Sequence, residues 1–374
     1  MGSWWEDQIP TIVEAYKKAA PNVNLTIEAL PVNGYVDKAV TTILSGDGPD
    51  ILTVDITQMG TFKDKDLLMP WNDQIADMDL SDFAAVIDGC KTGDTYYGLP
   101  YRTSSSIMFY NKDLFDAAGL DYPEEGWTYD DYLEYAKALT IPGQQYGTGI
   151  AASNSDPSNV FTSLSPVLWA YGADYMNEDE TECTLNTPEA VEAIRYWTGL
   201  YTTEKVVPEG TINYTITKDI MPMFIDGKIG MFLGGDQNAL EFDANYPDLN
   251  YGYVLPPDGT NGSGGWAFTV PVTAKNPQAA FDFCKWFLEP ENLGNLTVRI
   301  PARLEATQYG QWNTPLYQTV VKAAMDGRLS PTTPKWTDMQ KTIIVELQNI
   351  LQGAKTVEQG CEDMTAQCNA LLQQ

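Results

Sequence analysis

The sequence predicts an α/β fold with two domains. Stretches of helical periodicity alternate with short, apolar, β-branched stretches, an order typical of mainly parallel sheets flanked by helices. The chain has 374 residues, which is enough for two domains that each bury a hydrophobic core. Since no repeat or long flexible linker interrupts the sequence, we expect the two domains to share more than one connection.

The first part of the chain alternates between helix and strand. One-sided apolar periodicity predicts a helix over 9–20, and the alternation of apolar and polar residues over 23–27 predicts a half-buried strand. A second helix is predicted over 36–44, and a buried strand over 51–54, where β-branched residues predominate. The chain therefore begins as an alternating α/β structure.

Later helices are predicted from their first residues. Thr128 has an aspartate three positions later, which makes a capping box, while Thr187 and Asn276 each precede a proline that suits the first turn of a helix. The tail over 336–372 has the periodicity of two helices broken at Gly353. Polar, glycine-containing loops adjoin several of these elements, and such loops form the ligand crevice of open α/β sheets. They cover 143–156, 234–238 and 256–265.

Charge and composition exclude several classes of function. The 51 acidic residues outnumber the 22 basic ones, giving a net charge of −29, and no basic patch is visible, so binding to nucleic acid or to an anionic membrane surface is not expected. There is no histidine, which excludes Ser-His-Asp and Cys-His hydrolases and histidine-ligated metal sites. Any catalysis would have to rest on carboxylates, tyrosine, lysine or cysteine.

The five cysteines have the spacing of neither a metal site nor a redox motif. Cys361 and Cys368 share an apolar helical stripe and would lie about 10 Å apart along it, beyond the reach of a disulfide. We therefore expect core cysteines, with no metal, cofactor or disulfide. The cysteines are Cys90, Cys183, Cys284, Cys361 and Cys368.

The aromatic composition suits a sugar ligand. The 21 tyrosines and 10 tryptophans outnumber the 12 phenylalanines, and a pyranose offers an apolar face for stacking and hydroxyls for polar side chains. Most of these rings are nevertheless expected in the core, Trp197 and Trp286 among them. The glycine run that ends at Trp266 is stronger evidence for a binding site, because glycines let the backbone approach a ligand closely and the indole can stack on it. Carboxylates alone are weak evidence, since a glycosidase would be rich in them too.

A series of motifs extends along nearly the whole chain. The motifs are Gly46-Asp47-Gly48-Pro49-Asp50-Ile51, Tyr97-Gly98-Leu99-Pro100-Tyr101, Phe109-Tyr110-Asn111-Lys112-Asp113-Leu114-Phe115, Ala118-Gly119-Leu120, Trp127, Phe224-Ile225-Asp226-Gly227-Lys228-Ile229-Gly230-Met231, Gly264-Gly265-Trp266 and Ile300-Pro301-Ala302-Arg303. In this order they resemble the carbohydrate-binding extracellular solute-binding proteins of ABC importers, the group that includes maltose-binding protein.

The resemblance implies a periplasmic-binding-protein-like fold with two α/β lobes, which close by hinge movement on a ligand in the cleft between them. It implies the following division and hinge crossings. The first lobe takes 1–109 and 256–303, the second lobe takes 110–255 and 304–374, and the chain crosses near 109–111, 253–257 and 303–305.

The resemblance also places a set of residues where family members contact their ligands. These candidates are Asp55, Thr57, Gln58, Tyr101, Arg102, Ser104, Asn159, Asp236, Gln237, Trp266, Arg303 and Trp336. The chain departs from the family pattern at Val54, where an aromatic residue is common, and at Ser104, where some members have an acidic residue. It also has polar residues at 236 and 237, where an aromatic platform is common.

The function implied by the resemblance is binding of a sugar or oligosaccharide outside the cell and its delivery to the permease of an ABC transporter. The protein would act as a monomer without a cofactor, exported as a membrane-anchored lipoprotein or to the periplasm. Met1-Gly2-Ser3 resembles an engineered start, so the lack of a signal segment carries no information. The family's first strand, which would precede Trp4-Trp5, has no counterpart in this sequence.

Two alternatives of other classes stay open. An acidic cleft would suit a polyamine, so a solute-binding protein for a non-sugar ligand is the stronger of them. A carboxylate-based glycosidase or lyase is the weaker. Tryptophan fluorescence with oligosaccharides and polyamines separates the first alternative, and chromatography of incubated oligosaccharides separates the second, because a binding protein returns them intact.

Overall fold

The computed structural model describes residues 3–30 and 34–373, without the side chains of Ser3, Trp4 and Asp236. The chain forms two compact units, each made from two separate stretches of sequence. Unit 1 comprises Met1–Ser104 and Ser263–Pro334, and unit 2 comprises Ser105–Gly262 and Lys335–Gln374.

The chain passes from one unit to the other after Ser104, after Gly262 and after Pro334. The family resemblance implies a third passage near 303–305, whereas the structure keeps 304–334 in unit 1. Two contacts explain this difference. The short strand β9 (Arg328–Leu329) pairs with a strand of unit 1, and the Ser263 hydroxyl donates a hydrogen bond to the carbonyl of Ala324 at 3.5 Å.

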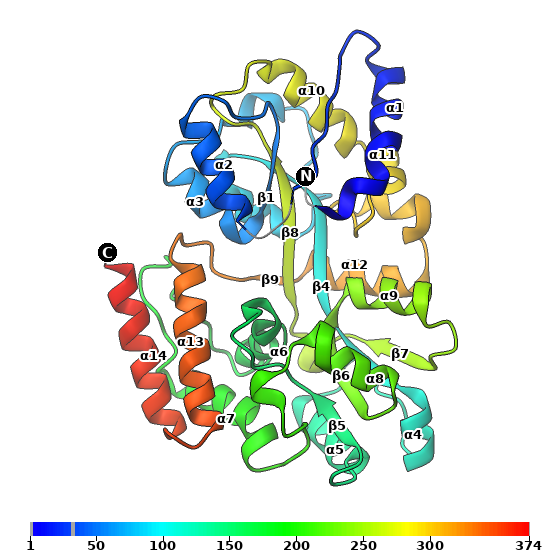
Figure 1. Cartoon of the computed structure of the whole chain (residues 1–374), viewed down its shortest axis with the longest axis vertical. Helices are drawn as coiled ribbons and strands as arrows, with labels where there is room; N and C mark the ends of the chain where they lie inside the picture. Colours follow the sequence, from blue (N-terminus) through cyan, green and yellow to red (C-terminus); the bar gives the residue numbers. More distant parts are fainter. Residues whose placement is uncertain (1–2, 31–33, 374) are drawn as a thin grey trace. The chain divides into compact units, whose positions relative to one another are not determined.

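Unit 1 combines a small sheet with helices from both stretches of sequence (Figure 1). Its strand β1 pairs antiparallel with β8, placing Asp55 opposite Trp266, and β1 ends the sheet. The helices are α1 (Ile9–Ala19), α2 (Tyr35–Leu44), α3 (Met59–Lys63), α10 (Pro277–Leu288), α11 (Pro290–Leu296) and α12 (Pro315–Met325). The strands are β1 (Leu52–Asp55), β2 (Lys91–Thr92), β3 (Thr95–Tyr96), β8 (Gly262–Thr269), β9 and the first half of β4 (Leu99–Asn111). The 3₁₀ helices are η1 (Ser3–Gln8), η2 (Ile56–Gln58), η3 (Asn72–Gln74), η4 (Ala85–Cys90), η8 (Glu305–Gln308) and η9 (Gly310–Trp312).

Unit 2 contains the second half of β4, which pairs antiparallel with β6 and β7, while β5 pairs parallel with β6. Its strands are β5 (Tyr146–Gly149), β6 (Ile229–Gly235) and β7 (Tyr251–Val254). Its α-helices are α4 (Lys112–Ala118), α5 (Tyr129–Leu139), α6 (Pro157–Ala170), α7 (Pro188–Thr202), α8 (Met221–Ile225), α9 (Asp236–Asn245), α13 (Trp336–Leu351) and α14 (Val357–Leu372). The short helical segments are η5 (Thr211–Asn213), η6 (Ile216–Ile220) and η7 (Pro257–Gly259).

The predicted α/β class is confirmed, and so are most of the predicted helices. Thr128 forms the predicted capping box, Thr187 accepts a cap hydrogen bond from Ala190, and the tail forms two helices separated at Gly353. The direction of strand pairing differs from the expected mainly parallel one, because β8 pairs antiparallel with β1, and β4 pairs antiparallel with β6 and β7. Residues 23–27, which were predicted to form a strand, belong to no strand of the structure.

Each unit has its own hydrophobic core. The core of unit 1 includes Trp5, Trp71 and Phe268, and that of unit 2 includes Trp197 and Trp336. The predicted stripe along α14 packs its two cysteines into the unit 2 core as free thiols. Within the described ranges, the helices lack the combination of length and apolar character needed to cross a bilayer.

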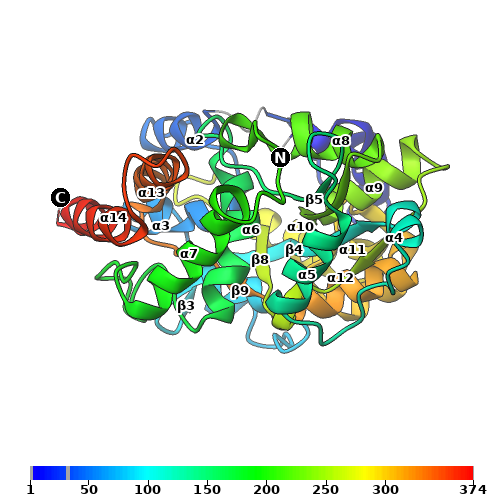
Figure 2. The ribbon, with the colours of Figure 1, turned by 90° about the horizontal axis from the view of Figure 1, so that it is seen from below.

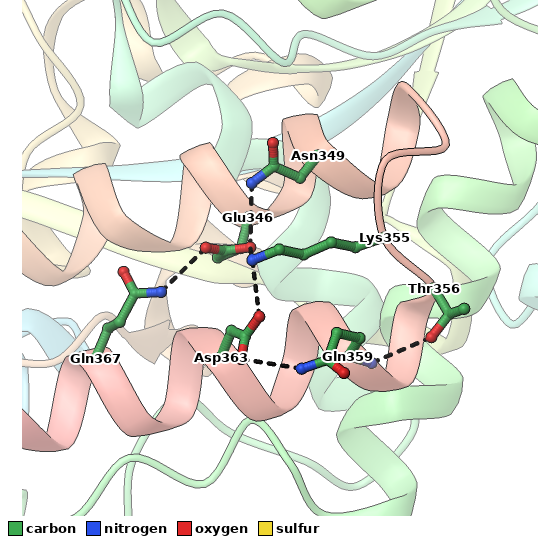
Figure 3. A network of polar contacts seen from close by, with 7 residues as sticks. All are labelled: Glu346, Asn349, Lys355, Thr356, Gln359, Asp363 and Gln367. Atoms are coloured by element: carbon green, nitrogen blue, oxygen red, sulfur yellow. Dashed lines mark hydrogen bonds and ion pairs between the residues drawn. The ribbon is translucent and has the colours of Figure 1, made fainter.

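The two tail helices are held together by a polar network on their facing sides. Figures 1 and 2 show α13, α14 and α7 side by side, and Figure 3 shows the network. The Glu346 carboxylate, on a residue only 4% exposed, accepts hydrogen bonds from Lys355 Nζ at 2.5 Å and Gln367 Nε2 at 3.0 Å. Asn349 Nδ2 also donates to it at 3.2 Å, and Lys355 Nζ contacts Asp363 Oδ2 at 2.7 Å. Burial raises the pKa of Glu346, but these hydrogen bonds outweigh it and hold the pKa below its ordinary value.

We expect Glu346→Gln to lower the free energy of unfolding by about 2 kcal/mol at pH 7, because the amide loses the charge-assisted hydrogen bonds. Since the folded state depresses the pKa of Glu346, its carboxylate stabilises the fold above the ordinary glutamate pKa of about 4.3. That stabilisation is lost as the pH falls through the folded-state pKa. Urea unfolding of both proteins at pH 7 and pH 3.5 should therefore show a smaller difference at pH 3.5.

The matched control is Asp338→Asn on the same helix. Asp338 pairs with Lys341 at 2.9 Å, but both side chains are more than half exposed. Such pairs contribute about 0.3 kcal/mol, so the free energy of unfolding should hardly change. A difference for Glu346→Gln that is as large at pH 3.5 as at pH 7 would show that packing, not charge, links the two helices.

Candidate functional site

The candidate residues at the end of β1 form a compact polar turn in unit 1. Asp55 is the last residue of β1, and its Oδ1 accepts hydrogen bonds from the backbone N–H of Thr57 at 2.9 Å and from the Thr57 hydroxyl at 2.6 Å. These bonds cap η2, which carries the half-buried Gln58. Among the residues that the structure describes, none donates a hydrogen bond to the second carboxylate oxygen, Oδ2. Asp55 therefore keeps one oxygen available to a ligand hydroxyl.

Trp266 lies on β8, the strand that pairs with β1. It stands opposite Asp55 in the strand register and is only 4% exposed. Its ring packs edge-on against Tyr35 with the ring centroids 5.7 Å apart, and the Tyr35 hydroxyl donates to the carbonyl of Thr53 at 2.7 Å. Trp266 is thus a core residue of unit 1 as well as a neighbour of the polar turn, so replacing it by alanine would also remove core packing.

Arg102 and Ser104 lie on the next strand, β4. They are half-buried and alternate with the buried Tyr101 and Thr103. The glycines of β8 bring the backbone close to them: a Cβ at position 264 would lie 3.1 Å from the Ser104 Oγ, and one at position 265 would lie 2.5 Å from the Arg102 carbonyl oxygen. The glycine run therefore serves close strand contact, and it sets Arg102 and Ser104 beside the strand that carries Trp266.

Two candidates of unit 1 are packed away from this group. Tyr101 is fully buried, with its ring 5.7 Å from Trp5 and 4.7 Å from Phe268, and burial raises the pKa of its hydroxyl. Arg303 is bound by protein groups: its Nε lies 2.7 Å from Asp82 Oδ2, and its Nη1 donates to a backbone carbonyl at 2.9 Å. Both side chains therefore serve the packing and ion pairing of unit 1.

Unit 2 has polar residues at the ends of two parallel strands. Since β5 and β6 run parallel, their carboxyl ends lie at the same edge of the sheet. Asn159 follows β5, but its Oδ1 already accepts the backbone N–H of Ile216 at 2.6 Å. Gln237 follows β6 and is exposed in the first turn of α9. The side chain of Asp236, next to it, lies outside the described part of the chain.

Trp336 lies in the core of unit 2. It is 1% exposed, and its ring packs edge-on against Phe161 and Tyr175 with centroids 5.3 Å and 5.0 Å away. It begins α13, so its ring anchors the two tail helices to α6. This position leaves no face of the indole for stacking on a sugar.

The residue-level prediction omits two serines at the same edge of unit 2. The hydroxyls of Ser153 and Ser155 lie 2.8 Å apart in the loop that follows β5, and Ser155 is exposed. They fall within the polar loop predicted over 143–156, and their position after a strand was the signal that could have selected them. Neutral hydroxyl pairs of this kind bind ligand hydroxyls without needing a charged ligand.

Both units thus carry polar side chains where strands end, which is the usual place of ligand sites in α/β proteins. The fold and these groups define a ligand-binding α/β protein. Residues 2–293 match the family model of the bacterial extracellular solute-binding proteins. The chain belongs to this family.

Three similar proteins illustrate the range of the family. A maltooligosaccharide ABC transporter solute-binding lipoprotein of Streptococcus pneumoniae is 25% identical over 378 residues, which cover 94% of this chain and 84% of that protein. The structure resembles that of an ABC transporter solute-binding protein from Thermotoga lettingae bound with α-D-tagatose (TM-score 0.83, 20% identity, 99% and 97% of the two chains covered). It also resembles an ABC substrate-binding protein from Listeria monocytogenes in complex with cycloalternan (TM-score 0.82, 23% identity, 99% and 97% covered).

Family membership makes the chain a binding protein and not an enzyme, and it places its relatives outside the bacterial cell. The expected fold is confirmed by the solved structures, which match almost the full length of the chain.

Proposed function

We propose that the protein binds a sugar or oligosaccharide outside the cell, using the polar turn at the end of β1 as the centre of its contact in unit 1. The observation that carries this proposal is the carboxylate of Asp55: Oδ1 is used by the turn, whereas Oδ2 accepts no hydrogen bond from the described residues. A carboxylate oxygen held in place accepts strongly from a hydroxyl. Arg102 and Ser104, half-buried on β4, add a donor and a hydroxyl in the same unit.

The ligand-binding set that we propose differs from the sequence-based one. It keeps Asp55, Thr57, Gln58, Arg102 and Ser104 in unit 1, with Trp266 behind them. It keeps Gln237 in unit 2, adds the hydroxyls of Ser153 and Ser155, and retains Asp236 as a candidate on sequence grounds alone. The set omits Tyr101, Arg303 and Trp336, whose side chains are enclosed by their own units. It also omits Asn159, whose Oδ1 accepts the backbone N–H of Ile216.

Ligand capture would proceed by hinge closure and end with delivery to the permease of an ABC transporter. Three passages of the chain between the units support a hinge, because several short connections restrict the motion to closing and opening. The ligand would stabilise the closed form by contacting residues of both units. The relative from Streptococcus pneumoniae is named as a lipoprotein of such a transporter, and we propose that this protein is likewise anchored as a lipoprotein. We further propose that it acts as a monomer.

The test is a titration of the protein with a panel of ligands, in which binding is measured by tryptophan fluorescence and by calorimetry. The panel contains maltooligosaccharides, arabinooligosaccharides, mannitol, tagatose and the polyamine spermidine. The first four are the ligands after which similar proteins are named or with which they were solved. We expect saturable binding of at least one sugar with dissociation constants in the micromolar range or tighter, and none of spermidine. Binding of spermidine alone would replace the sugar proposal by a polyamine one. Chromatography should recover the bound oligosaccharide intact.

A further inference from the structure

Three of the five cysteines lie in the core of unit 2, where sugar binding gives them no part. Cys361 and Cys368 are on the buried stripe of α14, and Cys183 lies in the segment that leads into α7, the helix beside α14 (Figure 1). All three are at most 1% exposed and are free thiols in the structure. The other two, Cys90 and Cys284, belong to the core of unit 1.

The backbone around Cys183 is held in place by a hairpin. Cys183 forms an antiparallel bridge with Met176. Directly after it, the backbone N–H of Thr184 donates to the carbonyl of Tyr175 at 3.0 Å, and the Thr184 hydroxyl donates to the carbonyl of Asp174 at 2.8 Å. The position from which the Cys183 thiol projects is therefore fixed before α7 begins.

The part of α14 around Cys368 is fixed on both sides. Gln367 donates to the buried carboxylate of Glu346 at 3.0 Å, and Asn369 Oδ1 accepts the backbone N–H of Cys183 at 2.8 Å. The second bond joins the two segments directly, because only one asparagine side chain separates the backbone of Cys183 from the helix, at the residue next to Cys368. A disulfide spans a similar gap, since it joins Cα atoms about 4.4–6.8 Å apart.

The two thiols meet between these fixed segments. Cys368 and Cys183 lie within hydrogen-bonding reach of each other, and this contact lowers the pKa of Cys183 and raises the pKa of Cys368. Cys361 is seven residues from Cys368 on the same helix, which is about 10 Å and too far for a bond between those two. Cys183 and Cys368 are thus the pair that the fold brings together.

We propose that Cys183 and Cys368 form a disulfide when the protein folds outside the cytoplasm. The family is that of bacterial extracellular solute-binding proteins, and extracellular compartments are those in which disulfides form and persist. Since both thiols are buried in the folded protein, the reaction takes place before α14 has fully packed against the hairpin. Both cysteines belong to unit 2, so the bond would leave the proposed hinge movement unaffected.

The oxidant is another disulfide, carried by a thiol–disulfide oxidoreductase or by a small thiol of the compartment. The thiolate of one cysteine attacks it, which forms a mixed disulfide and releases one thiol. The thiolate of the second cysteine then attacks the protein sulfur of the mixed disulfide and releases the other thiol. The two cysteines lose two protons and two electrons, and the two sulfurs of the oxidant gain them.

The test uses the full chain, unfolded and reduced in denaturant. It is refolded by dilution either into a mixture of oxidised and reduced glutathione or into a reductant. Free thiols are then alkylated in denaturant, and peptides are mapped by mass spectrometry without reduction. We expect oxidative refolding to link the peptides of Cys183 and Cys368 and to leave the other three cysteines alkylated. Because the bond closes a long loop, the midpoint of thermal unfolding should be higher than that of the reduced protein by about 5 °C or more.

The matched control is Cys361→Ala, which changes the same helix and core but keeps both partners. It should form the same link and show the same rise in the midpoint on oxidation, whereas Cys183→Ala should show neither. Alkylation of all five cysteines after oxidative refolding would overturn the proposal, and so would a link to Cys361 or glutathione retained on Cys183. The peptide map of the unchanged chain decides this even where a variant fails to fold.

Sugar binding is measured separately on the oxidised and the reduced protein with the ligand panel. We expect the two affinities to agree within twofold, because the bond lies inside one unit. A protein that binds sugar but forms no link contradicts the disulfide alone, and a linked protein that binds no sugar contradicts the proposed function alone.

Discussion

Replacing Arg303 by methionine should lower the free energy of unfolding by about 3 kcal/mol while changing the sugar affinity of the folded protein less than threefold. The side chains of Arg303 and Asp82 are only 10% and 16% exposed, and removing the cation leaves the carboxylate of Asp82 enclosed without its partner. Methionine keeps much of the apolar stem that packs near Phe83, whose ring lies 5.2 Å from the guanidinium. Urea unfolding measures the first quantity, and calorimetry with the bound sugar measures the second.

The control for this prediction is Arg195→Met in unit 2. Arg195 contacts Glu192 at 3.2 Å and Glu358 at 2.6 Å, but its side chain is 44% exposed. Exposed pairs of this kind contribute less than about 1 kcal/mol, so the loss should be small. The opposite result would be an unchanged free energy of unfolding for Arg303→Met together with a loss of sugar affinity of tenfold or more. In that case Arg303 contacts the ligand, as the family resemblance implies.

Asp55→Asn should weaken sugar binding by tenfold to a hundredfold, with little change in stability. Asparagine keeps the Oδ1 acceptor that Thr57 uses, so the turn after β1 is preserved. It replaces the free carboxylate oxygen by an amide group, which costs a charge-assisted hydrogen bond of about 1.5–3 kcal/mol to a ligand hydroxyl. Calorimetric titration with the sugar identified by the panel measures the change.

Asp79→Asn is a closely matched control in the same unit. The Oδ1 of Asp79 accepts the backbone N–H of Ser81 at 2.9 Å and the Ser81 hydroxyl at 2.7 Å, which repeats the local geometry of Asp55 away from the strand ends. We expect this variant to bind the sugar as the parent does. Equal affinities of the two variants would remove Asp55 from the binding site.

Helices whose ends are marked by adjacent residues could be predicted from the sequence. The strand expected over 23–27 could not, because a strand depends on a pairing partner elsewhere in the fold. The capping box at Thr128 and the break at Gly353 are written in adjacent residues, so the helices there follow directly. Residues 23–27 have the alternation of a strand, but a strand also needs a partner, and none of the described residues supplies one. Strand direction escaped prediction for a similar reason, because pairing of β1 with β8 joins residues far apart in the sequence.

The candidate residues that stay in the proposed site are those whose position depends on their strand. Asp55 at the end of β1 and Arg102 on β4 are placed by the strands themselves. Trp336 and Arg303 have partners that are distant in the sequence, and only tertiary packing shows that those partners enclose them. The exposure of a side chain is thus the property that local sequence patterns predict least well.

The turn after β1 also affects the entropy of binding. Two hydrogen bonds from Thr57 fix the carboxylate of Asp55 before any ligand arrives. Ordering a mobile side chain on binding costs about 0.5–1.5 kcal/mol, and this part of the cost is already met during folding. Thr57→Val, which removes one of the two bonds, would therefore weaken a ligand's contact with Asp55 by making the carboxylate mobile, although Thr57 itself need not touch the ligand.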